Sequence, residues 1–185
     1  NNKYLLTVSG RWDGASQLAE GNKWAFFPSA ALGWRLDQEE FLKDVTWLNQ
    51  LKFRLGVGVT GNSAIDPYQT KGAIVSLYYP FGSALAPGYA ASEPLIKDGA
   101  VAMANKNLSW EKTHTFDLGV DFELFKMFTM TFDYYWRSSN AVVSQDIAYE
   151  YGVSTMKLNG GKIQNSGVEF TVSFTPIQRK DWALS

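Results

Sequence analysis

The chain has 185 residues, a net charge of −1 and no cysteine, and aromatic residues make up 15% of it. The net charge near zero gives no strongly positive surface for binding nucleic acid, and the absence of cysteine excludes disulfide bonds and thiolate metal sites. Because the sequence has no run of about 18 apolar residues, it contains no transmembrane helix.

Six stretches alternate apolar and polar residues with a period of two, which predicts strands with one apolar and one polar face. They cover about 4–12, 26–36, 51–60, 113–124, 128–137 and 167–175. In the first stretch, Tyr4, Val8 and Trp12 share one face, and Arg11 lies on the other. Residues 182–185 predict a seventh strand that is cut off.

The apolar faces of these stretches carry no Lys, Arg, Asp or Glu. An outward Arg or Lys at mid-membrane would cost roughly 2–4 kcal/mol, so this absence is informative. Each stretch also approaches the roughly 9–11 residues that a tilted strand needs to cross a bilayer. The pattern predicts an all-β, antiparallel transmembrane β-barrel with lipid outside and water inside.

The connections are predicted to alternate between two rims of the barrel. Longer loops at 13–25, 61–112 and 138–166 belong to one rim, and connections at 37–50, 125–127 and 176–181 belong to the other. Within 37–50, the segment beginning at Asp37 favours a short helix. Long loops on one side and mostly short turns on the other are typical of extracellular and periplasmic rims.

On this topology, aromatic residues gather in two belts at the predicted membrane interfaces. The outer rim receives Trp12, Trp24, Trp110 and Trp136, and the inner rim receives Tyr4, Trp34, Trp47 and Trp182.

Six or seven strands with so polar an inner face are too few to close a barrel, because about eight already fill their interior with side chains. Open strand edges are not tolerated in lipid. We therefore expect residues 1–185 to be one partial barrel domain, incomplete at both ends and without a plug.

Two other classes of protein are compatible with parts of the pattern. A soluble β-sandwich binding module would bury the apolar face against a second sheet. A barrel enzyme would need a Ser–His pair with an orienting group, and His114, the single histidine, has apolar outward neighbours and no obvious serine partner. We therefore expect a protein that is not an enzyme.

The polar faces carry charged residues that are expected to face the lumen. They include Arg11, Arg54, Asp117, Asp121, Asp133, Arg137 and Glu169. These side chains either form a hydrated wall that pairs across strands and docks a plug, or they bind substrate. Asp117, Asp121 and Glu123 share one strand and lack convergent geometry, so we expect no metal ion and no cofactor.

The connection 61–112 is far longer than ordinary loops, which indicates function or disorder. It contains aromatic residues whose rings can stack on sugars or peptide side chains. They are Tyr68, Tyr78, Tyr79, Phe81 and Tyr89. The alternative is that these rings pack the loop on itself or against a partner protein.

Six strings occur in an order and spacing that resemble the SusC/RagA family of TonB-dependent outer-membrane transporters of Bacteroidetes. They are RWDGAS at 11–16, FFPSAALGWR at 26–35, LKFR at 51–54, GVTGN at 58–62, NLSWEKT at 107–113 and GKIQNSGVE at 161–169. The resemblance covers essentially the whole chain, and its specificity comes from the ordered set.

The resemblance implies a barrel of about 22 strands, a size at which a plugged lumen is expected. It also implies import of oligosaccharides or peptides across the bacterial outer membrane. The implied partners are a SusD-like surface lipoprotein and the TonB complex, which acts through an N-terminal region that has no counterpart in these residues. Outer-membrane lipid would surround the barrel, and nucleic acid is not an expected partner.

Overall fold

The computed structural model describes residues 3–67, 70, 75–90, 102–148, 150, 155–178 and 183–184. Its main element is an antiparallel sheet of six long strands that pair in chain order. These are β1 (Tyr4–Gly14), β2 (Trp24–Arg35), β3 (Leu48–Asn62), β7 (Glu111–Leu124), β8 (Phe128–Asp146) and β9 (Thr155–Phe174). The prediction of an all-β, antiparallel barrel segment is confirmed.

The remaining elements are short and lie at the ends of this sheet. They are the 3-10 helix η1 (Leu36–Gln38), the hairpin of β4 (Val75–Phe81) and β5 (Ala84–Ala90), the edge strand β6 (Ala102–Met103), and the pair β10 (Ile177–Gln178) and β11 (Ala183–Leu184). No helix in the described part of the chain is long and apolar enough to cross a membrane.

The strand register aligns the predicted apolar faces across all six long strands. One row contains Tyr4, Trp34, Phe53, Val120, Phe132 and Phe170, and the next contains Leu6, Leu32, Leu55, Leu118, Tyr134 and Val168. Directly opposite residues share one face of a sheet, so these rows form a continuous apolar surface. The alternating sequence therefore restricts the register, because a slip of one residue would mix the two faces.

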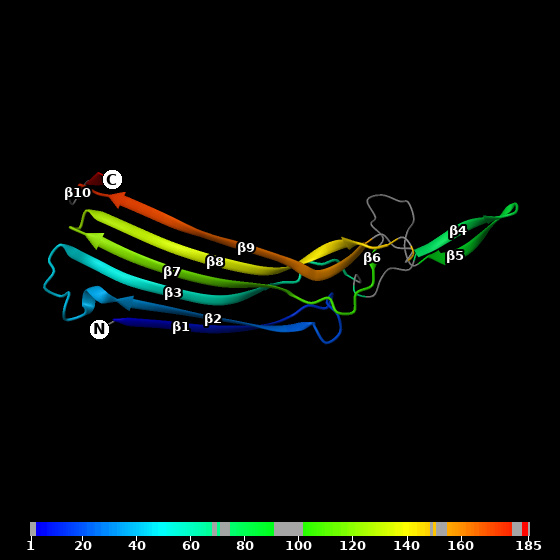
Figure 1. Ribbon diagram of the computed structural model, residues 1–185, viewed down its shortest axis with the longest axis horizontal. Coiled ribbons are helices and arrows are strands. Elements are labelled where there is room, and N and C mark those ends of the chain that lie inside the picture. Colours follow the sequence, from blue (N-terminus) through cyan, green and yellow to red (C-terminus); the bar gives the residue numbers. More distant parts are fainter. Residues whose placement is uncertain are drawn as a thin grey trace.

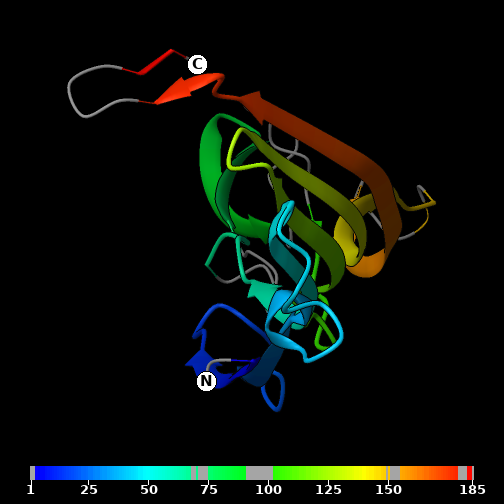
Figure 2. The same ribbon diagram turned by 90° about the vertical axis from the view of Figure 1, so that its left-hand side faces the viewer.

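This apolar surface is not covered by another layer of the described structure. Leu6 is 70% exposed and Val168 is 66% exposed, as expected for a face that meets lipid and not a protein core. Viewed from the short-turn end, the strands follow an open arc (Figure 2). The β-sandwich alternative is wrong for this sheet, because it required a second sheet against the apolar face.

The two ends of the sheet differ, as the connection lengths predicted. At one end lie η1, the turn that joins β7 to β8, and both chain termini, while the β4–β5 hairpin projects beyond the other end (Figure 1). We call these the short-turn end and the long-loop end. Tyr4 and Trp34 stack at the short-turn end with ring centroids 6.3 Å apart, and Trp47 lies near Phe125 there at 6.4 Å.

The prediction that residues 138–166 form a loop is largely wrong, because most of them belong to strands. β8 continues to Asp146 and β9 begins at Thr155, giving strands of 19 and 20 residues. The register shifts between Ala141 and Val142. Polar residues and this bulge remove the period-two signal, while the backbone ladder between the two strands continues.

Three other connections also differ from the prediction. The segment 61–112 contains the β4–β5 hairpin, although it was expected to be a loop. The helix expected from Asp37 is the three-residue η1, which begins one residue earlier. Near the C-terminus, Ala183–Leu184 pairs with Ile177–Gln178 and not with β9, while Trp182 lies outside the described residues.

Candidate functional site

The polar face of the sheet carries one connected group of charged side chains at its centre. The guanidinium of Arg54 donates from Nε to Oδ2 of Asp121 at 2.8 Å and from Nη2 to Oδ1 of the same carboxylate at 2.9 Å. The same Nη2 also donates to Oδ1 of Asp133 at 2.8 Å. Arg54 therefore ties β3 to β7 and β8 through charge-assisted hydrogen bonds.

A glycine makes this arrangement possible. Gly119 is the register partner of both Arg54 on β3 and Asp133 on β8, so it lies between them on the same face. A Cβ on Gly119 would collide with the Asp133 carboxylate and lie 2.7 Å from Nη2 of Arg54. Because Gly119 has no side chain, the guanidinium of Arg54 can extend across β7 to reach Asp133. The sequence pattern alone did not reveal this role.

The other predicted lumen residues do not join this group. Arg11 pairs with Asp13 at 2.7 Å, and Arg137 lies over the ring of Tyr135, with 5.5 Å between the guanidinium carbon and the ring centroid. Asp117 and Glu169 form no ion pair in the described part of the chain. Their register partners are, respectively, Gly56 and Asp133. In the described residues, the face is a distributed polar wall in which Arg54, Asp121 and Asp133 form an ion-paired group that joins three strands. Its role in binding a plug or substrate stays a prediction.

The long-loop end contains the small apolar core of the described residues. Phe27 is 4% exposed and meets Trp110 edge-on, with ring centroids 5.3 Å apart. Ala15, Leu18 and Ala25 complete this cluster, which we call the loop core. Because Trp110 packs into the loop core and donates from Nε1 to the carbonyl of Lys23, the prediction that it belongs to a lipid-facing belt is wrong.

The aromatic residues predicted to bind ligand are only partly placed. Tyr68 lies outside the described residues, and the structure gives only backbone positions for Tyr78, Tyr79, Phe81 and Tyr89. These four residues belong to the β4–β5 hairpin, where Tyr78 pairs with Pro87 and Tyr89 with Ser76. The hairpin extends beyond the loop core (Figure 1). Direct contact between these rings and a ligand stays a prediction.

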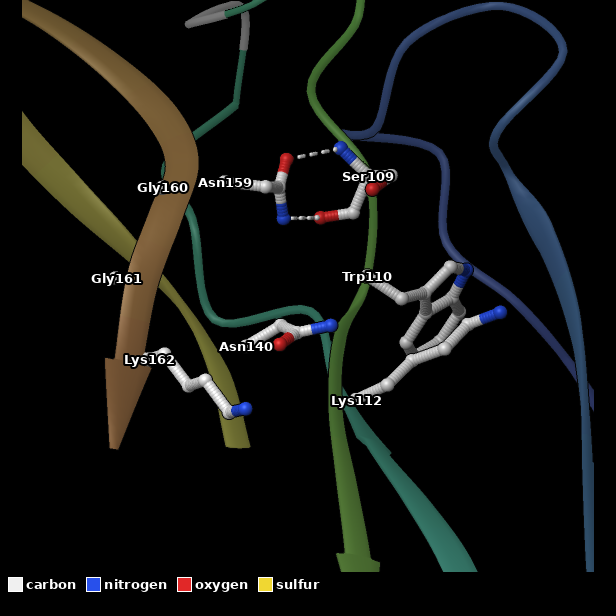
Figure 3. A pocket seen from close by; sticks show the side chains of 8 residues that line it. All are labelled: Ser109, Trp110, Lys112, Asn140, Asn159, Gly160, Gly161 and Lys162. Atoms are coloured by element: carbon white, nitrogen blue, oxygen red, sulfur yellow. Dashed lines mark hydrogen bonds between the residues drawn. The ribbon is translucent and has the colours of Figure 1, made fainter. Parts of the chain in front are cut away.

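A pocket of about 400 Å³ lies beside the loop core, lined by the segment that leads into β7, by Asn140 of β8 and by β9 (Figure 3). The side chain of Asn159 joins β9 to the segment that leads into β7 by pairing with the backbone of Ser109. Its Oδ1 accepts from the Ser109 amide at 2.9 Å, and its Nδ2 donates to the Ser109 carbonyl at 2.9 Å. The side-chain amide of Asn159 thus forms the two hydrogen bonds with Ser109 that a backbone amide and carbonyl of a neighbouring strand would form.

At the short-turn end, Glu39 fastens the turn after η1 to the first two strands. Its carboxylate accepts hydrogen bonds from Trp34 Nε1 at 3.1 Å, Lys3 Nζ at 3.1 Å and the Tyr4 hydroxyl at 2.9 Å. Together these donors hold the pKa of Glu39 below its usual range. Sequence reasoning missed this residue, because its partners lie on two different strands.

Asp37 anchors the same turn to β3. Burial would raise the pKa of Asp37, but hydrogen bonds from Arg35, Gln38 and the backbone amide of Leu51 outweigh it and lower the pKa overall. This carboxylate is therefore held in its charged form and stabilises the turn when ionised.

The structure places a serine beside His114, for which the sequence indicated no serine partner. Ser138 on β8 is directly opposite His114 on β7. The outward neighbours one row away are Phe116 and Trp136, which are not acids that could orient an imidazole. The described residues also contain no group of three or more His, Asp or Glu that could hold a metal ion.

Comparisons with known proteins agree with this architecture. The model of the family described as "TonB dependent receptor-like, beta-barrel" matches residues 1–185. TonB-dependent receptor SusC of Bacteroides thetaiotaomicron is 38% identical over the whole chain, and TonB-dependent receptor P3 of Formosa agariphila is 35% identical over 99% of it. In both cases the chain covers 18% of the relative, or about a fifth of its length.

A solved structure shows the same arrangement of strands. The RagAB peptide importer in its "open-open" state superposes with a TM-score of 0.81 at 26% identity, covering 98% of this chain and 19% of that one. The siderophore receptor PirA from Pseudomonas aeruginosa, at 18% identity and a TM-score of 0.56, shares the fold. The chain belongs to the TonB-dependent receptor-like β-barrel family and is SusC-like.

Proposed function

We propose that this chain forms part of the wall of an outer-membrane transporter that imports oligosaccharides or peptides. The observation that carries the proposal is the two-faced sheet. Its outward rows are apolar and uncovered, and its inward face carries the Arg54–Asp121–Asp133 group. A sheet with these two faces suits a wall between lipid and a polar lumen. The similarity to SusC and to the RagAB peptide importer supports a transport role.

The proposal includes two partners. A SusD-like surface lipoprotein would meet the long-loop end, and the TonB complex would act through another region of the full-length protein. The projecting β4–β5 hairpin supports the first contact, because it extends beyond the sheet at the end where a surface partner would approach (Figure 1). The inward charges would form a hydrated wall that also docks a plug.

Purification of the full-length protein from outer membranes tests the proposal. We expect it to fractionate with the outer membrane, to require mild detergent for extraction and to bring a lipoprotein with it. A water-soluble protein without membrane association would contradict the proposal. Uptake of labelled glycans and labelled peptides by cells with and without the gene would then identify the class of cargo.

The double variant Tyr78→Ala with Tyr79→Ala tests the proposed ligand contact. If these rings stack on cargo, uptake falls while the amount of protein at the cell surface stays the same. Phe41→Ala is a matched control, because Phe41 is an aromatic residue, 69% exposed, that follows η1 at the short-turn end. Unchanged uptake in the double variant would remove this tyrosine pair from the ligand site.

A further inference from the structure

The apolar outward face ends at a defined level on β7 and β8, and one row earlier on β9, where Ser166 pairs with Trp136. Phe116 and Trp136 form the outermost apolar row of these two strands, and the next row toward the long-loop end pairs His114 with Ser138. On β7 the apolar positions from Leu124 to Phe116 extend about 27 Å, at roughly 3.4 Å per residue. This run falls within the roughly 9–11 residues that a tilted strand needs to cross the bilayer, so the His114 row marks its outer border.

One row farther out, the same face becomes basic. Lys112 on β7 pairs in register with Asn140 on β8, and Asn140 pairs with Lys162 on β9. We call these three residues the lysine row. Its members have the same parity as Phe116 and Trp136, so they continue the face that would meet lipid. The row lies about 14 Å along the strand beyond that aromatic row, because four residues separate Lys112 from Phe116.

The two lysines of the lysine row are exposed and available to an external anion. In the described part of the chain, neither Lys112 nor Lys162 forms an ion pair. Glu111, the acid next to Lys112, already accepts from Asn62 Nδ2 at 2.7 Å and from the Val142 amide at 2.6 Å. The lysine row therefore presents positive charge that is not neutralised by its neighbours.

The lysine row also borders the pocket described above. In Figure 3 both lysines lie below the Asn159–Ser109 pairing, with Lys162 extending toward Asn140 and Lys112 extending along the ring of Trp110, away from Asn140. Gly160 and Gly161 line the same pocket, and a Cβ on Gly161 would lie 2.7 Å from Val143 Cγ1. A cavity with a polar lining and two cations at its border is suited to an anionic group that also carries hydroxyls.

We propose that the lysine row and its pocket bind the phosphorylated sugar headgroup of an outer-leaflet glycolipid. β7 and β9 are two strand spacings apart, about 10 Å, which suits a headgroup with separate phosphates better than one small anion. The lysines would contact phosphate, and the Asn140 amide would bond sugar hydroxyls. The apolar rows below the lysine row would contact the acyl chains. The inference rests on the proposed membrane location.

The test uses the full-length protein reconstituted in nanodiscs of phosphatidylcholine doped with lipid A, with retained lipid A counted by native mass spectrometry. In the double variant Lys112→Gln with Lys162→Gln, we expect retention to fall about 30-fold, taking about 1 kcal/mol for each lysine near the surface. Lys43→Gln with Lys126→Gln is the matched control, because it removes the same two charges from exposed lysines in turns at the short-turn end.

Two results would overturn the inference. One is equal retention of lipid A by the double variant and the wild type. The other is complete displacement of lipid A by inorganic phosphate at equal concentration, which would show a general anion site and not a glycolipid site. A protein that fails to reach the outer membrane would instead refute the proposed function, so the two failures are distinguishable.

Discussion

Replacing Gly119 with alanine tests the claim that this glycine allows Arg54 to cross β7. The added Cβ would collide with the Asp133 carboxylate and lie 2.7 Å from Nη2 of Arg54. Both neighbours belong to the ion-paired group, so the Arg54–Asp133 hydrogen bond must lengthen or break. Gly56→Ala is the matched control, since Gly56 also lies on the polar face and a Cβ there would meet its nearest atom, Asp117 Cβ, at 3.7 Å.

The structure sets the size of the expected effect. A hydrogen bond to a charged group contributes about 1.5–3 kcal/mol, whereas an exposed ion pair contributes roughly 0.2–1 kcal/mol. The Arg54 side chain is 38% exposed and that of Asp133 is 31% exposed, which places this pair between the two cases. We expect Gly119→Ala to lower the free energy of unfolding by about 1–2 kcal/mol. Gly56→Ala should leave it unchanged or raise it by about 0.4–1 kcal/mol.

The assay is urea unfolding of the full-length protein in detergent, followed by tryptophan fluorescence. Combining Gly119→Ala with Arg54→Gln should cost less than the sum of the two single changes, because both remove the same contact. Equal stability of the Gly119→Ala and Gly56→Ala variants would refute the steric argument. So would strict additivity of Gly119→Ala and Arg54→Gln.

Three further predictions concern the ends of the sheet. Because the pKa of Asp37 is lowered in the folded protein, its stabilising contribution is present above the usual carboxyl pKa of about 4 and is lost as the pH falls below it. Asp37→Asn should therefore reduce the unfolding midpoint at pH 7 and flatten its dependence on pH in the acid range, and an unchanged acid profile would contradict this. Phe27→Ala should destabilise the loop core by about 3–5 kcal/mol and speed proteolysis at the long-loop end. Phe26→Ala, at an exposed neighbouring position, should have a smaller effect, and equal cleavage rates would contradict the packing argument. Asn159→Ala removes both hydrogen bonds to the backbone of Ser109, so hydrogen exchange at that amide should accelerate by about 5- to 30-fold, as for a loss of about 1–2 kcal/mol. Unchanged exchange would show that the segment is held by other contacts.

The sequence by itself determined the presence of the six long strands, their two faces and their antiparallel order in the chain. Alternation with period two is a local property, and it excludes any register between neighbouring strands that would bring the polar face of one beside the apolar face of the other. That is why each residue of the row from Tyr4 to Phe170 could be assigned to the apolar face of its own strand, whereas the pairing of these residues into one row comes from the structure. The resemblance to the SusC/RagA family followed from ordered strings in the same stretches, and the family match confirms it.

Only the tertiary structure decided where the strands end and which polar residues meet. The extensions of β8 and β9 beyond Arg137 and before Gly167 form through backbone pairing between strands, which leaves no alternation for a sequence pattern to detect. Arg54 could be assigned to the polar face from its parity, but its two carboxylate partners depend on the path over Gly119. The buried position of Trp110 likewise depends on Phe27, which lies 83 residues earlier in the chain. Side-chain parity is set by the backbone of a single strand, whereas these contacts require several strands to be in place at once.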